Sequence, residues 1–389
     1  MKWTPLTWAA LASLLVAFVV GKIGQRQRAN GRLDAAFPEL VLQPSESSNV
    51  LHATHRDEPS SRSYVSVADA PGWGGRLTLA MQLDSAGNLQ HAEILEAHET
   101  GAFLRRVLDA GLLRRFQGLS VSDVDAEHIA VDGVSGATVT SNAIKRAVAR
   151  SLEQAGRSIF EREYAEPSWA IRIGGAEAAL IVLYSFVITA VVLKKTKWRS
   201  IGYVGGFLII GVLSTTPLSL ASLTAIAMGH LPSLRDQLFW WLLAGGALCS
   251  PLILRKNIYC AWMCPFAAIE EALAASGGIK FSLSPRARKF ARRGTFALLW
   301  LSLMLAFLQH DASAATYEPF FIFSFIGTDF QWYLATLALL GSFFVPRFWC
   351  RFFCPVGEIL SAIVKLRGQL HRSSQASPTR LPILGRHPR

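Results

Sequence analysis

Long apolar stretches separated by short basic loops fill the second half of the chain. They lie at residues 171–193, 201–227, 237–254, 295–308 and 332–345. About 20 helical residues cross the ~30 Å hydrocarbon core of a bilayer, so each stretch is a candidate span. A sixth apolar run, at residues 6–20, has no small-residue cleavage site after it, which favours an uncleaved anchor over a signal peptide. The pattern predicts an all-α polytopic membrane domain with about six transmembrane helices.

Residues 25–168 have a different pattern, with recurring charges and turn signals. Apolar and polar positions partly alternate over 76–84 and again over 89–95, around a Gly-Asn turn, which predicts a β-hairpin. Helical spacing follows at 102–116 and at 141–153. The second of these has one apolar side, formed by Ala143, Ile144, Ala147, Val148 and Leu152. We therefore expect an α+β domain here, between an anchor (1–24) and the membrane domain (169–365), with a disordered, lipid-facing basic tail at 366–389.

Charge supports a membrane protein and predicts its orientation. The chain is 51% hydrophobic, with a mean hydropathy of +0.31 and a net charge of +12. The basic residues gather in the short loops at 194–199, 255–256, 286–293 and 347–372, and such loops face the cytoplasm. With no nucleic-acid-binding motif beside it, this charge does not indicate a nucleic-acid partner. We expect a bacterial inner-membrane protein with a periplasmic α+β domain and cytoplasmic termini.

The cysteines form an internal repeat. Cys260-x-x-x-Cys264-Pro recurs as Cys350-x-x-x-Cys354-Pro, with an aromatic residue before the first cysteine of each copy. Cysteines at positions i and i+4 of a helical turn face the same way, so two pairs supply four thiolates. Four thiolates hold a [4Fe–4S] cluster, and Cys-Pro is familiar in ferredoxin motifs. We expect the cluster at the cytoplasmic face.

Other interpretations of the cysteines stay open. Four thiolates also suit zinc, and the four cysteines can belong to one cluster or to parts of two. A cytoplasmic disulfide is unfavourable. The fifth cysteine, Cys249, has no such pattern around it and is expected to be a small core residue.

A second motif lies before the helix at 141–153. The run Asp132-Gly133-Val134-Ser135-Gly136-Ala137-Thr138 resembles the flavinylation motif of FMN-binding domains, as in the C-type subunit of the sodium-pumping quinone reductase and the G-type subunit of the Rnf complex. The resemblance implies a phosphoester between FMN and Thr138, installed by a flavin transferase. It also implies FMN contacts from Asp132, Ser135, Gly136, Ala137, Glu99 and Thr100. The small residues and the following helix N-terminus suit a phosphate, although an ordinary helix cap is the alternative.

An FMN-binding domain joined to two C-x-x-x-C-P motifs is similar to the NosR/NirI family, in a short form without a C-terminal ferredoxin domain. The resemblance implies a membrane electron-transfer component, rather than a stand-alone enzyme, that serves a periplasmic reductase of the nitrous oxide reductase type or its maturation factors. The alternatives are a redox-sensing regulator of such a reductase and a zinc-containing assembly scaffold. Because about 30 Å would separate the two faces, we expect a further carrier, a quinone or a haem, with His230 and His310 as candidate haem ligands.

Overall fold

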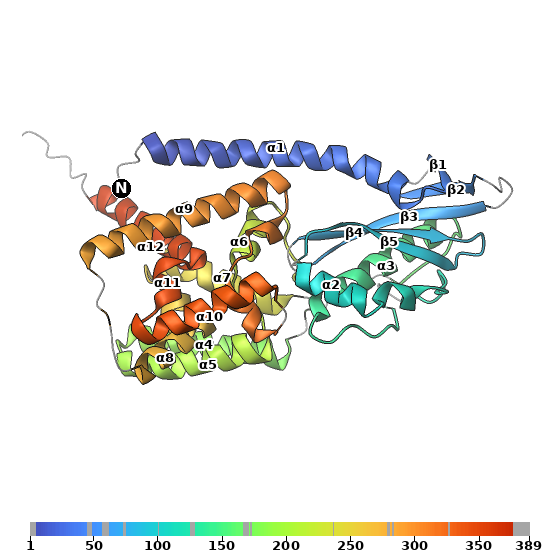
Figure 1. Ribbon diagram of the computed structural model, residues 1–389. Coiled ribbons are helices and arrows are strands. Elements are labelled where there is room, and N and C mark those ends of the chain that lie inside the picture. The colour runs from blue at the N-terminus through green and yellow to red at the C-terminus, as the bar shows by residue number, and fades with distance from the viewer. Residues whose placement is uncertain are drawn as a thin grey trace, which may run out of the picture.

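The structure is a computed structural model. It describes residues 5–44, 49–56, 62–72, 75–99, 101–124, 129–165, 171, 173–235, 237–277, 281, 284–325 and 327–375. A sheet domain and a helical domain lie side by side, and the long first helix runs along both (Figure 1).

The first helix, α1 (Pro5–Ala36), extends well beyond the predicted anchor. Its apolar part packs along α9 (Pro285–Gln309), and its C-terminal end reaches the sheet (Figure 1). Gly21 makes the close approach to α9 possible, because a Cβ atom at this position would lie 1.9 Å from the Phe307 carbonyl oxygen. Helix α1 thus contacts both the helical domain and the sheet domain.

The sheet domain contains five antiparallel strands in sequential order. They are β1 (Leu40–Pro44), β2 (Val50–His55), β3 (Arg62–Pro71), β4 (Arg76–Leu83) and β5 (Leu89–Ala97). The predicted hairpin is confirmed as β4–β5, and its turn is fixed by Asp84, whose carboxylate accepts the N–H groups of Ala86 and Asn88 at 2.9 and 2.8 Å.

Helix α3 (Thr138–Ser158) covers one face of the sheet and begins earlier than the pattern predicted. All five residues of its predicted apolar side are fully buried, and all but Ala143 belong to one core cluster with the inward side chains of β4. The helical stretch predicted at 102–116 is instead α2 (Gly101–Asp109) followed by a 3₁₀ turn (Leu112–Phe116). The break comes at Gly111, whose φ of 67° no helix accommodates.

The helical domain contains eight further α-helices besides α9 in the part of the chain that the structure describes. They are α4 (Gly175–Val192), α5 (Arg199–Gly206), α6 (Leu220–Ala227), α7 (Leu238–Ile253), α8 (Pro265–Ser276), α10 (Asp329–Phe344), α11 (Phe348–Phe352) and α12 (Pro355–Gln375). Helix α5 continues as a π-helix over Phe207–Leu213. Because α12 runs to Gln375, the prediction of a disordered tail from residue 366 is wrong for its first ten residues.

The expected six spans are not all found. Among the described residues, three helices have the length and composition to cross a membrane: Thr7–Gly24 within α1, Gly175–Val192 and Pro285–Gln309. Helices α7 and α10 are apolar but shorter, at 16 residues each, or about 24 Å at 1.5 Å per residue. The span predicted at 201–227 is wrong, since its helix ends at Leu213 and a non-helical segment precedes α6.

Candidate functional site

The two cysteine motifs meet in the middle of the helical domain. All four cysteines of the repeat line one cavity of about 370 Å³, which we call the cysteine cavity. Within the described residues, no three His, Cys, Asp or Glu side chains converge as the ligands of a single ion must. Four thiols around one cavity can supply the four thiolates of a [4Fe–4S] cluster, and four thiolates also suit zinc.

Each motif ends at a helix N-terminus. Cys264 is the N-cap of α8, and Cys354 directly precedes the first residue of α12. The N–H group of Gly357 donates to Cys354 Sγ at 3.3 Å. Proline as the first helical residue has no N–H to leave unpaired, and the positive helix end favours a thiolate. The Cys-Pro pair therefore aims backbone donors at a negatively charged sulfur.

The cysteine cavity is also basic. Arg292, Arg347 and Arg351 line it. Burial raises the pKa of the Cys260 thiol to about 12 and that of Cys264 to about 11, so these thiols hold their protons until a metal displaces them. The arginines then offset the charge of the thiolates.

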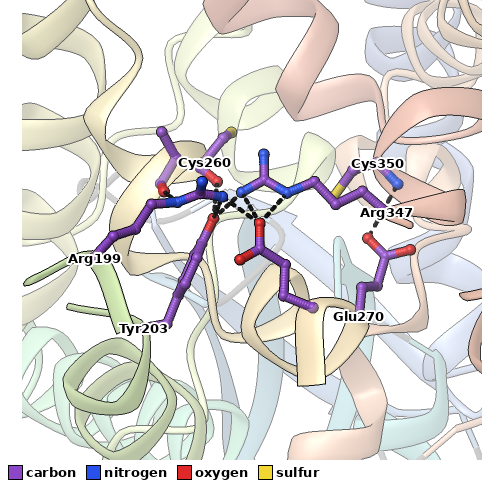
Figure 2. A network of polar contacts seen from close by, with 8 residues as sticks. Arg199, Tyr203, Cys260, Glu270, Arg347 and Cys350 are labelled. Carbon is purple, nitrogen blue, oxygen red and sulfur yellow. Dashed lines mark hydrogen bonds and ion pairs between the residues drawn. The ribbon is translucent and has the colours of Figure 1, made fainter. Parts of the chain in front are cut away.

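Polar contacts lock the two motifs together (Figure 2). Glu270, on α8 after the first motif, accepts the backbone N–H groups of Trp349 at 2.6 Å and Cys350 at 3.3 Å in the second. Its neighbour Glu271 binds both Arg199 and Arg347, and the two guanidinium groups converge on the Tyr203 hydroxyl. Each motif is thus held by residues from outside its own copy of the repeat.

The predicted flavin residues gather at the start of α3. Thr138 is exposed there as the first helical residue, preceded by Gly136 (φ 81°) and the buried Ala137. The Glu99 side chain is buried beside them and accepts the Thr140 hydroxyl at 2.8 Å. Asp132 and Ser135 are exposed in the preceding loop, and Thr100 lies outside the described residues. The loop leaves a hydroxyl at a helix N-terminus, where an esterified phosphate would find free N–H donors.

A second cavity, of about 390 Å³, opens directly against Thr138. We call it the interdomain cavity. On the sheet-domain side it is lined by residues 136–140 and Phe103; on the other side it is lined by residues 213–217, Ser219, Thr316, Glu318, Phe320, Phe321, Ser324 and Gln331. Sequence reasoning missed this wall, because the 201–227 stretch reads as a continuous apolar helix. The signal that was available is the run Ser214-Thr215-Thr216-Pro217 in its middle.

The interdomain and cysteine cavities are neighbours. Phe320 lines both, and the segment that contributes Pro217 and Ser219 to the first contributes Leu218 to the second. Hydrogen bonds tie this region to the motifs: Leu218 N–H donates to the Tyr259 hydroxyl at 3.0 Å, and the Tyr317 hydroxyl donates to the Phe353 carbonyl at 2.8 Å. The cysteines and the flavin residues therefore line neighbouring cavities.

The expectation for the fifth cysteine is corrected, and the two candidate haem ligands lie together at the domain interface. Cys249 is exposed on α7 rather than packed in the core. The His230 and His310 rings contact each other, with centroids 5.8 Å apart, and His98 of the sheet domain stacks on His230 at 5.9 Å.

Comparison with known proteins finds two domain families in this chain. Residues 72–153 match the FMN-binding domain family, and residues 237–284 and 333–372 match the 4Fe-4S binding domain family. The chain thus has the two domains of a flavin- and iron–sulfur-containing protein, joined in one molecule.

The chain is similar to the NosR and NirI proteins over about half of its length. The regulatory protein NosR of Pseudomonas aeruginosa is 24% identical over 237 residues, covering 56% of this chain and 33% of NosR. NirI of Paracoccus denitrificans is 24% identical over 214 residues, or 51% and 31% of the two chains. YccM of Escherichia coli is 24% identical over 185 residues, which cover 41% of this chain and 51% of YccM. The chain spans about a third to a half of these relatives.

Proposed function

We propose that this protein is a membrane-bound electron-transfer flavoprotein of the denitrification type. A [4Fe–4S] cluster held by Cys260, Cys264, Cys350 and Cys354 exchanges electrons with FMN joined to Thr138 by a phosphoester. A flavin transferase attaches the FMN. The bound FMN can accept or release one or two electrons. The observation that carries the proposal is the wall shared by the two cavities at Phe320. A further carrier, haem or quinone, is then unnecessary between the two centres.

The direction of transfer follows from the membrane arrangement that we propose. The basic segments face the cytoplasm, and the sheet domain with its flavin faces the periplasm of the inner membrane. The acceptor is then a periplasmic reductase of the nitrous oxide reductase type or a maturation factor for it. The similarity to NosR and NirI supports this context.

Two sets of variants test the electron-transfer proposal. Thr138→Val removes the acceptor hydroxyl at nearly constant shape, so covalent flavin, seen as in-gel fluorescence after denaturation, should disappear at unchanged protein abundance. Cys354→Ser should remove the cluster, measured as iron and sulfide per protein, whereas the matched control Cys249→Ser should keep it. Full flavin in Thr138→Val, or full iron in Cys354→Ser, would overturn the proposal.

The second candidate function is a redox-sensing regulator, which the name of NosR, a regulatory protein, favours. Both functions need the same cofactors, so transcription separates them. In a regulator, Thr138→Val changes the transcript level of the reductase genes. In an electron-transfer protein, it lowers reductase activity at an unchanged transcript level.

A further inference from the structure

The interdomain cavity has an unusual polar lining. Glu318 is only 1% exposed, and one of its carboxylate oxygens accepts the Leu220 N–H at 2.7 Å. The other oxygen is buried and has no hydrogen-bond partner in the part of the chain that the structure describes. The same holds for the hydroxyls of Ser214, Thr216 and Thr316, which line the same cavity. A buried polar group without a hydrogen-bond partner is destabilising, so four such groups around one cavity indicate a ligand that pairs with them.

The other lining residues indicate the shape of that ligand. Phe103, Phe320 and Phe321 supply aromatic surface from both domains, while the unpaired groups come from two neighbouring segments of the helical domain. Aromatic walls with a few convergent polar groups suit a flat aromatic ring that has hydrogen-bonding atoms along its edge.

The attachment site decides which ring this is. Residues 136–140, with Thr138 among them, form the wall opposite Glu318. We infer that the interdomain cavity holds the isoalloxazine ring of the flavin on Thr138, and that Glu318 is a positioning residue that hydrogen-bonds the edge of the ring. The inference rests on the proposed function, because it needs a flavin at Thr138. It adds a ring site built by the helical domain, which the FMN-binding domain match at 72–153 does not include.

The charge state of Glu318 follows from its burial. Desolvation outweighs the hydrogen bond from Leu220 and raises the pKa of Glu318 to about 8. At neutral pH the side chain then carries a proton on its free oxygen and donates to a ring acceptor. Above pH 8 it is a carboxylate and can only accept.

The test uses the full-length, flavinylated protein and asks where the ring lies. Thr216→Trp fills the cavity and should expel the ring. Iodide quenching of flavin fluorescence should then rise several-fold, although in-gel fluorescence shows the same amount of attached flavin. The matched control is Thr336→Trp, because Thr336 is exposed on α10 and lines neither cavity. Iodide should quench the flavin fluorescence of Thr336→Trp to the same extent as that of the wild type.

Glu318→Gln is the second variant, and it separates positioning from folding. It keeps the size of the side chain but cannot ionise. The wild-type visible absorption and circular dichroism of the flavin should change between pH 7 and pH 9, and this change should be absent in Glu318→Gln. The control Glu39→Gln, at an exposed position, should show the same spectral change between pH 7 and pH 9 as the wild type.

The outcomes distinguish the inference from the proposed function. A wild type without covalent flavin, from cells that make the transferase, overturns both. Attached flavin that responds to neither variant overturns the inference alone and leaves electron transfer in place. If Thr216→Trp does not accumulate, the pH response of Glu318→Gln decides. Displacement of a bound ubiquinone analogue by Thr216→Trp, with the flavin unchanged, would assign the cavity to a quinone and also overturn the inference.

Discussion

Glu270 of the first cysteine repeat binds the backbone N–H of Cys350 in the second, at 3.3 Å. The same carboxylate also accepts Trp349 N–H at 2.6 Å and the Ser342 hydroxyl at 2.9 Å, and its side chain is fully buried. A buried carboxylate that satisfies two consecutive N–H groups fixes the turn on which Cys350 lies. One half of the duplication therefore holds a cluster ligand of the other half in place.

Replacing this carboxylate should loosen the cluster without removing a ligand. Glu270→Gln places amide hydrogens where the second motif presents N–H donors, so one donor loses its partner at a cost of about 1–3 kcal/mol. We expect iron to be lost at lower chelator concentration and at lower temperature than in the wild type. The exposed Glu93→Gln is the control, and equal iron retention in the two variants would contradict the structural role.

Thr140 should matter for stability but not for flavin attachment. Its hydroxyl donates to Glu99 at 2.8 Å, and both side chains are buried. Thr140→Val removes this buried hydrogen bond and leaves Thr138 in place, so we expect a loss of about 0.5–1.5 kcal/mol in the unfolding free energy. Covalent flavin per folded protein should match the wild type. Loss of covalent flavin from a folded Thr140→Val protein would show that Thr140, too, is needed for attachment.

The sequence predicts features that depend on local pattern. The β4–β5 hairpin, the buried side of α3 and the pairing of the cysteine motifs all follow from periodicity or from a repeat. Strands β1 to β3 were missed because their sequences lack a clear two-residue alternation. In β1, for example, Leu40 is buried while Val41, its apolar neighbour, is exposed.

Features that depend on three-dimensional packing could not be predicted. Apolarity alone does not show that the helix ends at Leu213. Two residues later, Thr215 takes a positive φ of 49°. The end of the helix lets Leu218 reach Tyr259, and the segment that follows lines both the cysteine cavity and the interdomain cavity. The role of Glu318 depends on the same packing, because a single glutamate in a loop has no sequence signature.

The contact between His98 and Asp311 should make the domain interface sensitive to pH. His98 Nδ1 lies 3.6 Å from Asp311 of the helical domain, and its Nε2 lies 3.2 Å from Glu96. Burial by itself lowers the pKa of His98, but the hydrogen bonds and charges of these two carboxylates outweigh it and raise the pKa to about 9. Since the unfolded value is about 6.5, this contribution is fully present below pH 6.5 and is lost as the pH rises through 9.

The neighbouring histidine acts in the opposite direction. Burial, together with the charges of His98, His310 and Arg76, lowers the pKa of His230 to about 4, so its contribution is present above pH 6.5 and is lost as the pH falls toward 4. Taken by themselves, these two histidines make the interface most stable near pH 6.5. Thermal unfolding from pH 6.5 to 9.5 should show a loss of up to about 3 kcal/mol in the wild type. His98→Gln should flatten this profile, and the exposed His91→Gln should keep it; a flat wild-type profile would contradict the ion pair.

The packing of α1 on α9 should depend on the smallest residue in their contact. A Cβ at Gly21 would lie 1.9 Å from the Phe307 carbonyl oxygen, which belongs to helix backbone and cannot move aside. Small residues let helices approach closely within a membrane, so Gly21→Leu should push α1 away from α9. The cost should be at least the 1–3 kcal/mol or so that is typical of overpacking.

Two measurements check this, both in detergent-solubilised protein. The melting temperature should fall in Gly21→Leu, and the fluorescence of Trp300, whose indole N–H reaches the Ala10 carbonyl oxygen on α1 at 3.3 Å, should shift toward that of a more exposed tryptophan. Gly245→Leu is the matched control, because Gly245 lies in the apolar helix α7 with no atom within 4 Å of the added Cβ. If the two leucine variants melt together, the close approach at Gly21 does not hold α1 in place.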